Sequence, residues 1–93
     1  MKLAWARRAQ HDLLDLQEYA RLQPSLGNRI ADALETACDQ ITLFPLSGRL
    51  GRVEGTHEIV LSGTPYIAAY KVEAPRVTIL AIIHGARRWP KAF

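Results

Sequence analysis

Cysteine is almost missing from this sequence of 93 residues, in which Cys38 is the only one. A single cysteine excludes a disulfide within the chain, so we expect a reducing compartment and interpret Cys38 as a buried structural thiol. The sequence also lacks a long apolar run near its start, because two arginines follow Ala6. We therefore expect neither a signal peptide nor a membrane-spanning segment, and predict a cytoplasmic protein.

Repeats, low-complexity runs and linkers are also missing, and the length predicts one domain that spans residues 1–93. Hydrophobic residues make up 48% of the chain, which is typical of a folded protein and not of a disordered tail. The net charge of +3 indicates an acidic partner, such as nucleic acid or an acidic protein, although the excess is modest. His11 and His57 have no further ligands at metal-binding spacing, so we expect no metal ion and no cofactor.

Two amphipathic helices are predicted in the first half of the chain. In residues 7–22, apolar side chains recur every three or four positions from Ala9 to Ala20, and polar side chains take the other positions. Pro24 ends this helix, and a second apolar stripe continues from there to Pro45. The short connection predicts an antiparallel helical hairpin that covers one face of a sheet, with partner binding as the alternative role.

Four strands complete the expected α+β fold, whose order is β-α-α-β-β-β. Residues 77–83 are apolar or β-branched without a break, which predicts a central strand buried on both faces. Short turns join it to the two preceding strands, so these three are expected to form an antiparallel sheet with the αα-hairpin packed on one face. A short strand at residues 2–6 is expected to add at one edge. The other two strands are expected at residues 57–62 and 66–73.

The side chains best suited to binding or catalysis follow the end of the last strand. A rigid strand end would present imidazole, guanidinium and indole groups together, so we expect functional contacts here. The simpler interpretations are that His84 is a core-edge histidine bonded to the backbone and that Trp89 is a hydrophobic cap. An exposed tryptophan next to Arg87 and Arg88 is, however, also typical of an interface hot spot.

A loop at residues 45–56 places Arg49 and Arg52 between glycines. Glycine permits close backbone approach, so this loop could present two guanidinium groups to a phosphate or a carboxylate. It is not a phosphate-binding P-loop, because the Gly-Lys-Ser/Thr ending is missing. We favour a solvated connecting loop over a direct anion site.

Several short motifs occur in a fixed order along nearly the whole chain, starting with Asp12-Leu13 in the first helix. The later ones are Pro45…Gly48-Arg49, Glu58-Ile59-Val60 before Gly63-Thr64-Pro65-Tyr66 and Tyr70, and Ile83-His84-Gly85-Ala86-Arg87. In their order and spacing these motifs resemble the RelE/ParE superfamily of bacterial toxins. Members of this superfamily are the toxin halves of type II toxin–antitoxin modules.

The superfamily divides by target. RelE-like members cut mRNA on the ribosome, whereas ParE-like members poison DNA gyrase and have lost the nuclease residues. The resemblance implies that Arg87 matches an arginine that stabilises charge on phosphate in the nucleases. The other positions depart: Glu58 and Val60 replace lysines, Ile67 replaces an arginine, and Phe93 lies near the position of a tyrosine. The chain therefore looks closer to ParE-like than to RelE-like members, and an enzyme inhibitor is expected more than an enzyme.

Three hypotheses follow from the resemblance. The first is a ParE-like toxin that binds and inhibits DNA gyrase. The second is a RelE-like, ribosome-dependent mRNA endoribonuclease, and the third is a non-toxic domain that keeps only the antitoxin interaction. Each implies a cognate antitoxin and a hetero-oligomer with it. The target-binding candidates are Arg87, Arg88, Trp89, Arg49 and Arg52, and a nuclease would use Arg87 with His84 or Glu58 as catalytic residues.

Overall fold

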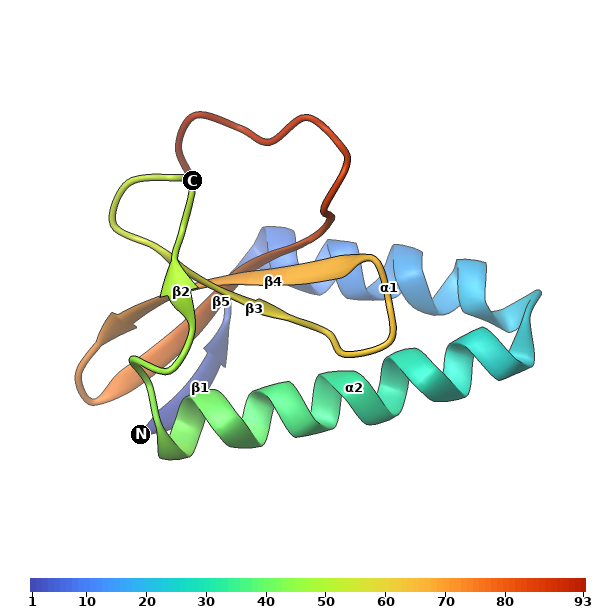
Figure 1. Ribbon diagram of the computed structural model, residues 1–93, viewed down its shortest axis with the longest axis horizontal. Coiled ribbons are helices and arrows are strands. Elements are labelled where there is room, and N and C mark those ends of the chain that lie inside the picture. Colours follow the sequence, from blue (N-terminus) through green and yellow to red (C-terminus); the bar gives the residue numbers. More distant parts are fainter.

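The computed structural model describes residues 1–93, in which two long helices pack on a sheet of five strands. Figure 1 shows the helices side by side, joined by a tight turn at the end farthest from the chain termini. This arrangement confirms the predicted α+β class and the helical hairpin. The elements are β1 Lys2–Trp5, α1 Arg7–Arg21, α2 Pro24–Leu43, β2 Arg49–Leu50, β3 His57–Val60, β4 Tyr66–Glu73 and β5 Arg76–His84.

The strand order is β1-β5-β4-β3-β2, and three details differ from the sequence prediction. The sheet is mixed, because β1 pairs in parallel with β5 while the other pairs are antiparallel. Strand β4, not β5, is central, and the expected loop contains the additional edge strand β2. Short turns fix the direction of β3, β4 and β5, but two helices separate β1 from the rest of the sheet and leave its direction open.

A bulge in β5 explains why its apolar run is unbroken. Ala69 pairs with Ala81 but Tyr70 pairs with Ile79, so Leu80 is an extra residue in β5. A bulge shifts the alternation of side chains by one position. Before Leu80, odd-numbered side chains of β5 such as Ile79 face the helices. After Leu80, the even-numbered Ile82 faces them instead. Leu80 itself is only half-buried, so the strand is not fully covered on both faces as predicted.

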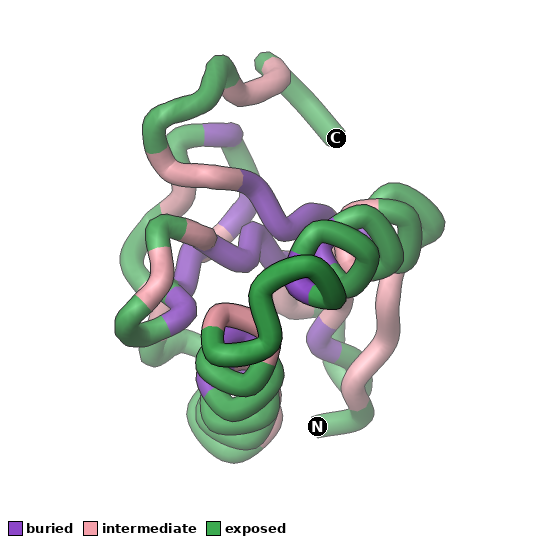
Figure 2. The backbone as a smooth tube through the Cα atoms, turned by 90° about the vertical axis from the view of Figure 1, so that its right-hand side faces the viewer, coloured by how far each residue is buried: buried purple, intermediate pink, exposed green.

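The main core lies between the helices and the sheet, where buried positions gather (Figure 2). Its largest fully buried side chains come from α2, from the start of the β3–β4 turn and from the two long strands. Burial of each aliphatic side chain among them contributes roughly 1.5–3 kcal/mol. These side chains are Ile41, Leu61, Tyr70, Val77 and Ile79.

The other face of the sheet is also buried, although no helix covers it. Ile67, Ala69, Ala81 and Ile83 are at most 6% exposed and do not belong to the helix-side core cluster. The irregular parts of the chain, residues 51–56 and 85–93, lie on this side (Figure 1). The sheet is therefore covered by helices on one face and by two short segments on the other.

Candidate functional site

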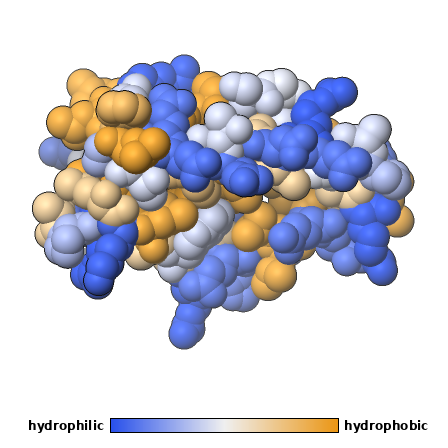
Figure 3. Space-filling model, turned by 90° about the horizontal axis from the view of Figure 1, so that it is seen from below, coloured by the Kyte–Doolittle hydropathy of each residue, from blue (hydrophilic) through white to orange (hydrophobic).

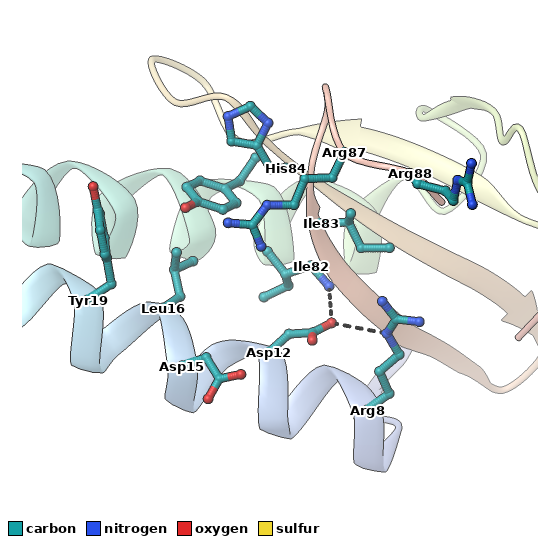
Figure 4. A pocket seen from close by; sticks show the side chains of 11 residues that line it. Arg8, Asp12, Asp15, Leu16, Tyr19, Ile82, Ile83, His84, Arg87 and Arg88 are labelled. Carbon is teal, nitrogen blue, oxygen red and sulfur yellow. Dashed lines mark hydrogen bonds and ion pairs between the residues drawn. The ribbon is translucent and has the colours of Figure 1, made fainter. Parts of the chain in front are cut away.

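A pocket of about 500 Å³ lies between α1 and the end of β5 (Figure 4). It brings together His84, Arg87 and Arg88 from the chain after β5 with polar side chains of α1. In Figure 4, Arg87 extends over the pocket while Arg88 turns away from it. Neither arginine makes an ion pair within the chain, so both guanidinium groups are free to bind a partner.

The chain turns sharply after His84, and this turn sets the direction of the side chains that follow. Arg87 N–H donates to the His84 carbonyl at 3.0 Å, and Ala86 N–H donates to His84 Nδ1 at 3.1 Å. An imidazole that accepts at Nδ1 carries its proton at Nε2. At Gly85 an added Cβ would lie 3.1 Å from Ile67 Cδ1, so a larger residue would require the end of the Ile67 side chain to shift by a few tenths of an ångström.

Helix α1 supplies a polar wall of the pocket, built mainly from side chains that the sequence analysis placed outside the apolar stripe. Asp12 Oδ2 accepts a hydrogen bond from Ile82 N–H at 2.9 Å and lies 3.6 Å from Arg8 Nε (Figure 4). The bond satisfies a strand amide beyond the last residue that β1 pairs with. The signal was present, because Arg8, Asp12, Asp15 and Tyr19 recur at the helical spacing of four, three and four residues.

The loop-covered face of the sheet contains a buried carboxylate, that of Glu58, which is 2% exposed. Its Oε2 accepts from the backbone N–H of Arg52 at 2.7 Å, and its Oε1 accepts from Arg49 Nη2 at 3.1 Å. Arg52 Nε lies 3.4 Å from the same carboxylate. Both arginines of the loop thus neutralise Glu58, and neither guanidinium is free in the way an anion-binding loop would require.

This environment argues against Glu58 as a catalytic base. Burial raises the pKa of Glu58, but the Arg52 N–H and the two guanidinium groups outweigh it and hold the pKa below its usual range. A carboxylate with a lowered pKa is a weak proton acceptor near neutral pH. His84 packs edge-on against Tyr66 on the helix side, whereas Glu58 lies on the other face. The structure does not bring together the acid and the base that a nuclease would use.

Arg52 also holds the C-terminal segment. Its guanidinium lies 3.9 Å from the centroid of the Trp89 ring, and its Nη1 donates to the Gly85 carbonyl at 3.4 Å. The indole Nε1 of Trp89 is buried and has no hydrogen-bond partner. Trp89 is therefore held by the stacked guanidinium and by packing.

Three residues of the shared motifs meet at Tyr70. The Tyr70 hydroxyl donates to the Pro45 carbonyl at 2.8 Å and accepts from Gly48 N–H at 3.0 Å. An added Cβ at Gly48 would lie 2.5 Å from that hydroxyl, so only glycine fits there. Burial raises the pKa of Tyr70, and the hydrogen bond from Gly48 partly offsets this. These motifs join α2 to the sheet and are structural.

The structure contains no group of three or more His, Cys, Asp or Glu side chains placed to hold a metal ion. Neither helix is long and apolar enough to cross a membrane.

Comparisons with known proteins agree with this architecture. The chain is 33% identical to "Putative toxin Y4kP" of Sinorhizobium fredii over 97% of its length and 94% of that protein. It is 32% identical to "Toxin RelE2" of Caulobacter vibrioides over 92% of its length and 97% of that protein.

The fold matches a solved structure described as "Chromosomal ParDE TA system from P. aeruginosa", with a TM-score of 0.75 and 22% identity. The match covers 90% of this chain and 95% of that one. A family model of the ParE toxin of the type II toxin–antitoxin system parDE matches residues 3–89. The chain therefore belongs to the ParE toxin family of type II toxin–antitoxin systems.

Proposed function

We propose that this toxin acts in the ParE manner, by binding and inhibiting DNA gyrase, and not by cleaving RNA. The observation that carries the proposal is the state of Glu58, which is buried, neutralised by two arginines and separated by the sheet from His84. A ribonuclease needs oriented donors and a proton acceptor around one phosphate. At the position where RelE-like nucleases have an arginine, Ile67 is 6% exposed and is part of the buried sheet.

The proposed contact surface for the target is the chain that follows β5. Arg87 and Arg88 are exposed and make no ion pair, and Trp89 lies beside them. Arginine and tryptophan are enriched among residues that dominate protein interfaces. Arg49 and Arg52 lie 56% and 41% exposed at their side chains, so they still present positive charge at the rim of this surface.

We further propose that a cognate antitoxin neutralises this toxin in a hetero-oligomer, and that both act in the cytoplasm. An apolar pocket of about 310 Å³ between α1 and α2 is suited to hydrophobic side chains of such a partner. Figure 3 shows hydrophobic side chains gathered where α2 leads into β2. Four of them are at least 66% exposed, namely Leu43, Phe44, Leu46 and Leu50. Exposed apolar patches of this kind are typical of protein interfaces.

Pulse-labelling of DNA and protein synthesis in the first minutes after induction without antitoxin tests the target. We expect DNA synthesis to stop first while translation continues, and Arg87→Ala to delay the arrest. Early arrest of translation would instead support the ribonuclease alternative, for which Arg87 and His84 share one pocket. An unchanged rate of both would support a non-toxic, antitoxin-binding domain.

A further inference from the structure

The C-terminal segment, residues 85–93, has little backbone support. Gly85 N–H donates to the Pro65 carbonyl at 2.8 Å, but the last hydrogen bond along the segment is from Arg87 N–H to His84. Residues 88–93 make no hydrogen bond to the rest of the chain. Side-chain contacts must therefore hold this end of the chain against the sheet, and there are two involving cations: Arg52 over Trp89 at 3.9 Å and Arg8 over Phe93 at 5.6 Å.

The Arg52 contact is the better built of the two. Trp89 is half-buried, whereas Phe93 is 44% exposed, and the shorter distance places the Arg52 guanidinium directly over the indole ring. Attraction between a cation and an aromatic ring weakens with distance and with exposure to water. Arg52 also donates to the Gly85 carbonyl, so one guanidinium contacts both the start and the middle of the segment.

The position of Arg52 is in turn set by Glu58. An arginine side chain has many rotamers, and without a partner its guanidinium would not stay over an aromatic ring. Glu58 receives both the backbone N–H and the guanidinium of Arg52, at 2.7 Å and 3.4 Å. Because Glu58 lies on a paired strand and its side chain is 1% exposed, it is a rigid support for the arginine.

We propose that Glu58 is a positioning residue that acts through Arg52 to seat Trp89, so that residues 85–93 are ordered before a partner binds. We call Glu58, Arg52 and Trp89 the C-terminal latch. The functional part of the proposal rests on the proposed function, in which this segment meets the target. Ordering the segment in advance lowers the entropy lost on binding, because Arg87 and Arg88 already occupy fixed places.

Two arginines that bind the same carboxylate give a matched pair of variants. Arg49 and Arg52 both contact Glu58, but only Arg52 contacts Trp89 and Gly85. Trypsin cleavage of the full chain after Arg88, followed by mass spectrometry, reports how often the segment leaves the sheet. We expect Arg52→Gln and Glu58→Gln to raise the initial cleavage rate there roughly tenfold, and Arg49→Gln to change it less than twofold.

Substitutions at Trp89 test the other end of the latch. Trp89→Ala should raise the same cleavage rate as much as Arg52→Gln, whereas Trp89→Phe, which keeps an aromatic face, should restore most of the protection. Quenching of Trp89 fluorescence by acrylamide, measured in a Trp5→Phe background, should increase in Glu58→Gln and stay unchanged in Arg49→Gln. These readouts follow the segment and not the whole fold.

Equal cleavage rates in Arg49→Gln and Arg52→Gln would overturn the latch. An increase of cleavage after Arg29, within α2, as large as the increase after Arg88 would also overturn it, because Glu58 would then support only the fold in general. Growth inhibition separates this proposal from the proposed function. If the latch variants release the segment yet arrest growth as the parent does, the latch stands and the proposed contact surface is wrong.

Discussion

The two faces of the sheet are covered in different ways. On one face, two helices bury a continuous cluster of aliphatic side chains around Tyr70 and Ile79. On the other face, two irregular segments are held by a buried carboxylate, two arginines and a stacked tryptophan. The first arrangement depends on many small apolar contacts, and the second depends on a few polar ones.

This difference indicates how stability and function are divided in the toxin. Many apolar contacts make the helix-covered face cooperative, because each buried side chain packs against several others and supports them in turn. The loop-covered face depends on single residues, so it can rearrange or be altered locally without loss of the fold. The C-terminal segment lies on the side of the molecule with fewer supports, and it carries Arg87 to the pocket beside α1, as expected for binding residues carried by loops on a rigid scaffold.

Removal of core volume on the helix-covered face should have the largest effect on stability. Ile79 is 1% exposed, and Ile79→Ala should lower the free energy of unfolding by about 2–5 kcal/mol. Denaturant unfolding measures this, with Leu50→Ala as the control because Leu50 is 82% exposed. Similar losses in the two variants would mean that the helix-covered face is not the main source of stability.

The hydroxyl of Tyr70 should contribute the next largest effect. Tyr70→Phe leaves the Pro45 carbonyl and Gly48 N–H without their partner, which should lower the free energy of unfolding by about 1–3 kcal/mol. Tyr19→Phe is the matched control, since Tyr19 is 51% exposed. Thermal unfolding of both variants checks the prediction, and an unchanged Tyr70→Phe would show that these hydrogen bonds add no net stability.

Loss of the Glu58 charge should cost less and should depend on pH. The folded pKa of Glu58 lies below its ordinary value of 4.5, so its stabilisation is complete above that pH and is lost as the pH falls through the folded pKa. Glu58→Gln should lower stability by about 1 kcal/mol at pH 7, since both arginines are partly solvated.

The measurement is the free energy of unfolding between about pH 3 and pH 7, a range that includes an ordinary Glu pKa. In Glu58→Gln this free energy should fall less steeply as the pH is lowered. Glu73→Gln is the control, because the pKa of Glu73 is lowered by Lys71 but the carboxylate is exposed. A decline as steep in Glu58→Gln as in the parent would contradict a buried, charged Glu58.

The smallest effect on stability is expected at Arg87, where the effect on activity should be large. Arg87 is exposed and makes no ion pair, so Arg87→Ala should change the free energy of unfolding by less than about 0.5 kcal/mol. Growth arrest after induction should nevertheless weaken at least roughly tenfold, as for loss of an interface hot spot. Lys2→Ala, at the distant start of β1, is the control; equal growth arrest in both variants would remove Arg87 from the contact surface.

The sequence predicted the helix-covered face well because that face is periodic. Apolar residues at helical spacing predicted both helices, and turn residues such as Gly63 and Pro65 predicted where strands end and begin. The unbroken apolar run predicted that β5 is a buried strand. It did not predict the bulge, because a shift in register leaves an all-apolar pattern unchanged. Nothing local could set the parallel direction of β1, because its partner follows more than 70 residues later.

The candidate site was only partly predictable, for a related reason. The candidate contact residues after β5, Arg87 to Trp89, could be predicted because they are neighbours in the chain. The role of Glu58 could not, since its partners become visible only when β2 pairs with β3 and places Arg49 opposite it. The polar wall of α1 was visible as a stripe, but its direction depends on how the helix packs against β5.

The sequence by itself determined the elements of this toxin and the apolar face of each, because these depend on side-chain periodicity along a few turns or residues. Only the tertiary structure decided which charged side chains form ion pairs within the chain and which remain unpaired. Glu58 forms ion pairs with Arg49, which lies opposite it across the strand pair, and with Arg52 in the following loop, while Arg87 and Arg88 have no such partner. The physical reason is that ion pairs form between groups close in space, and strand pairing brings together residues whose distance along the chain carries no signal of that contact.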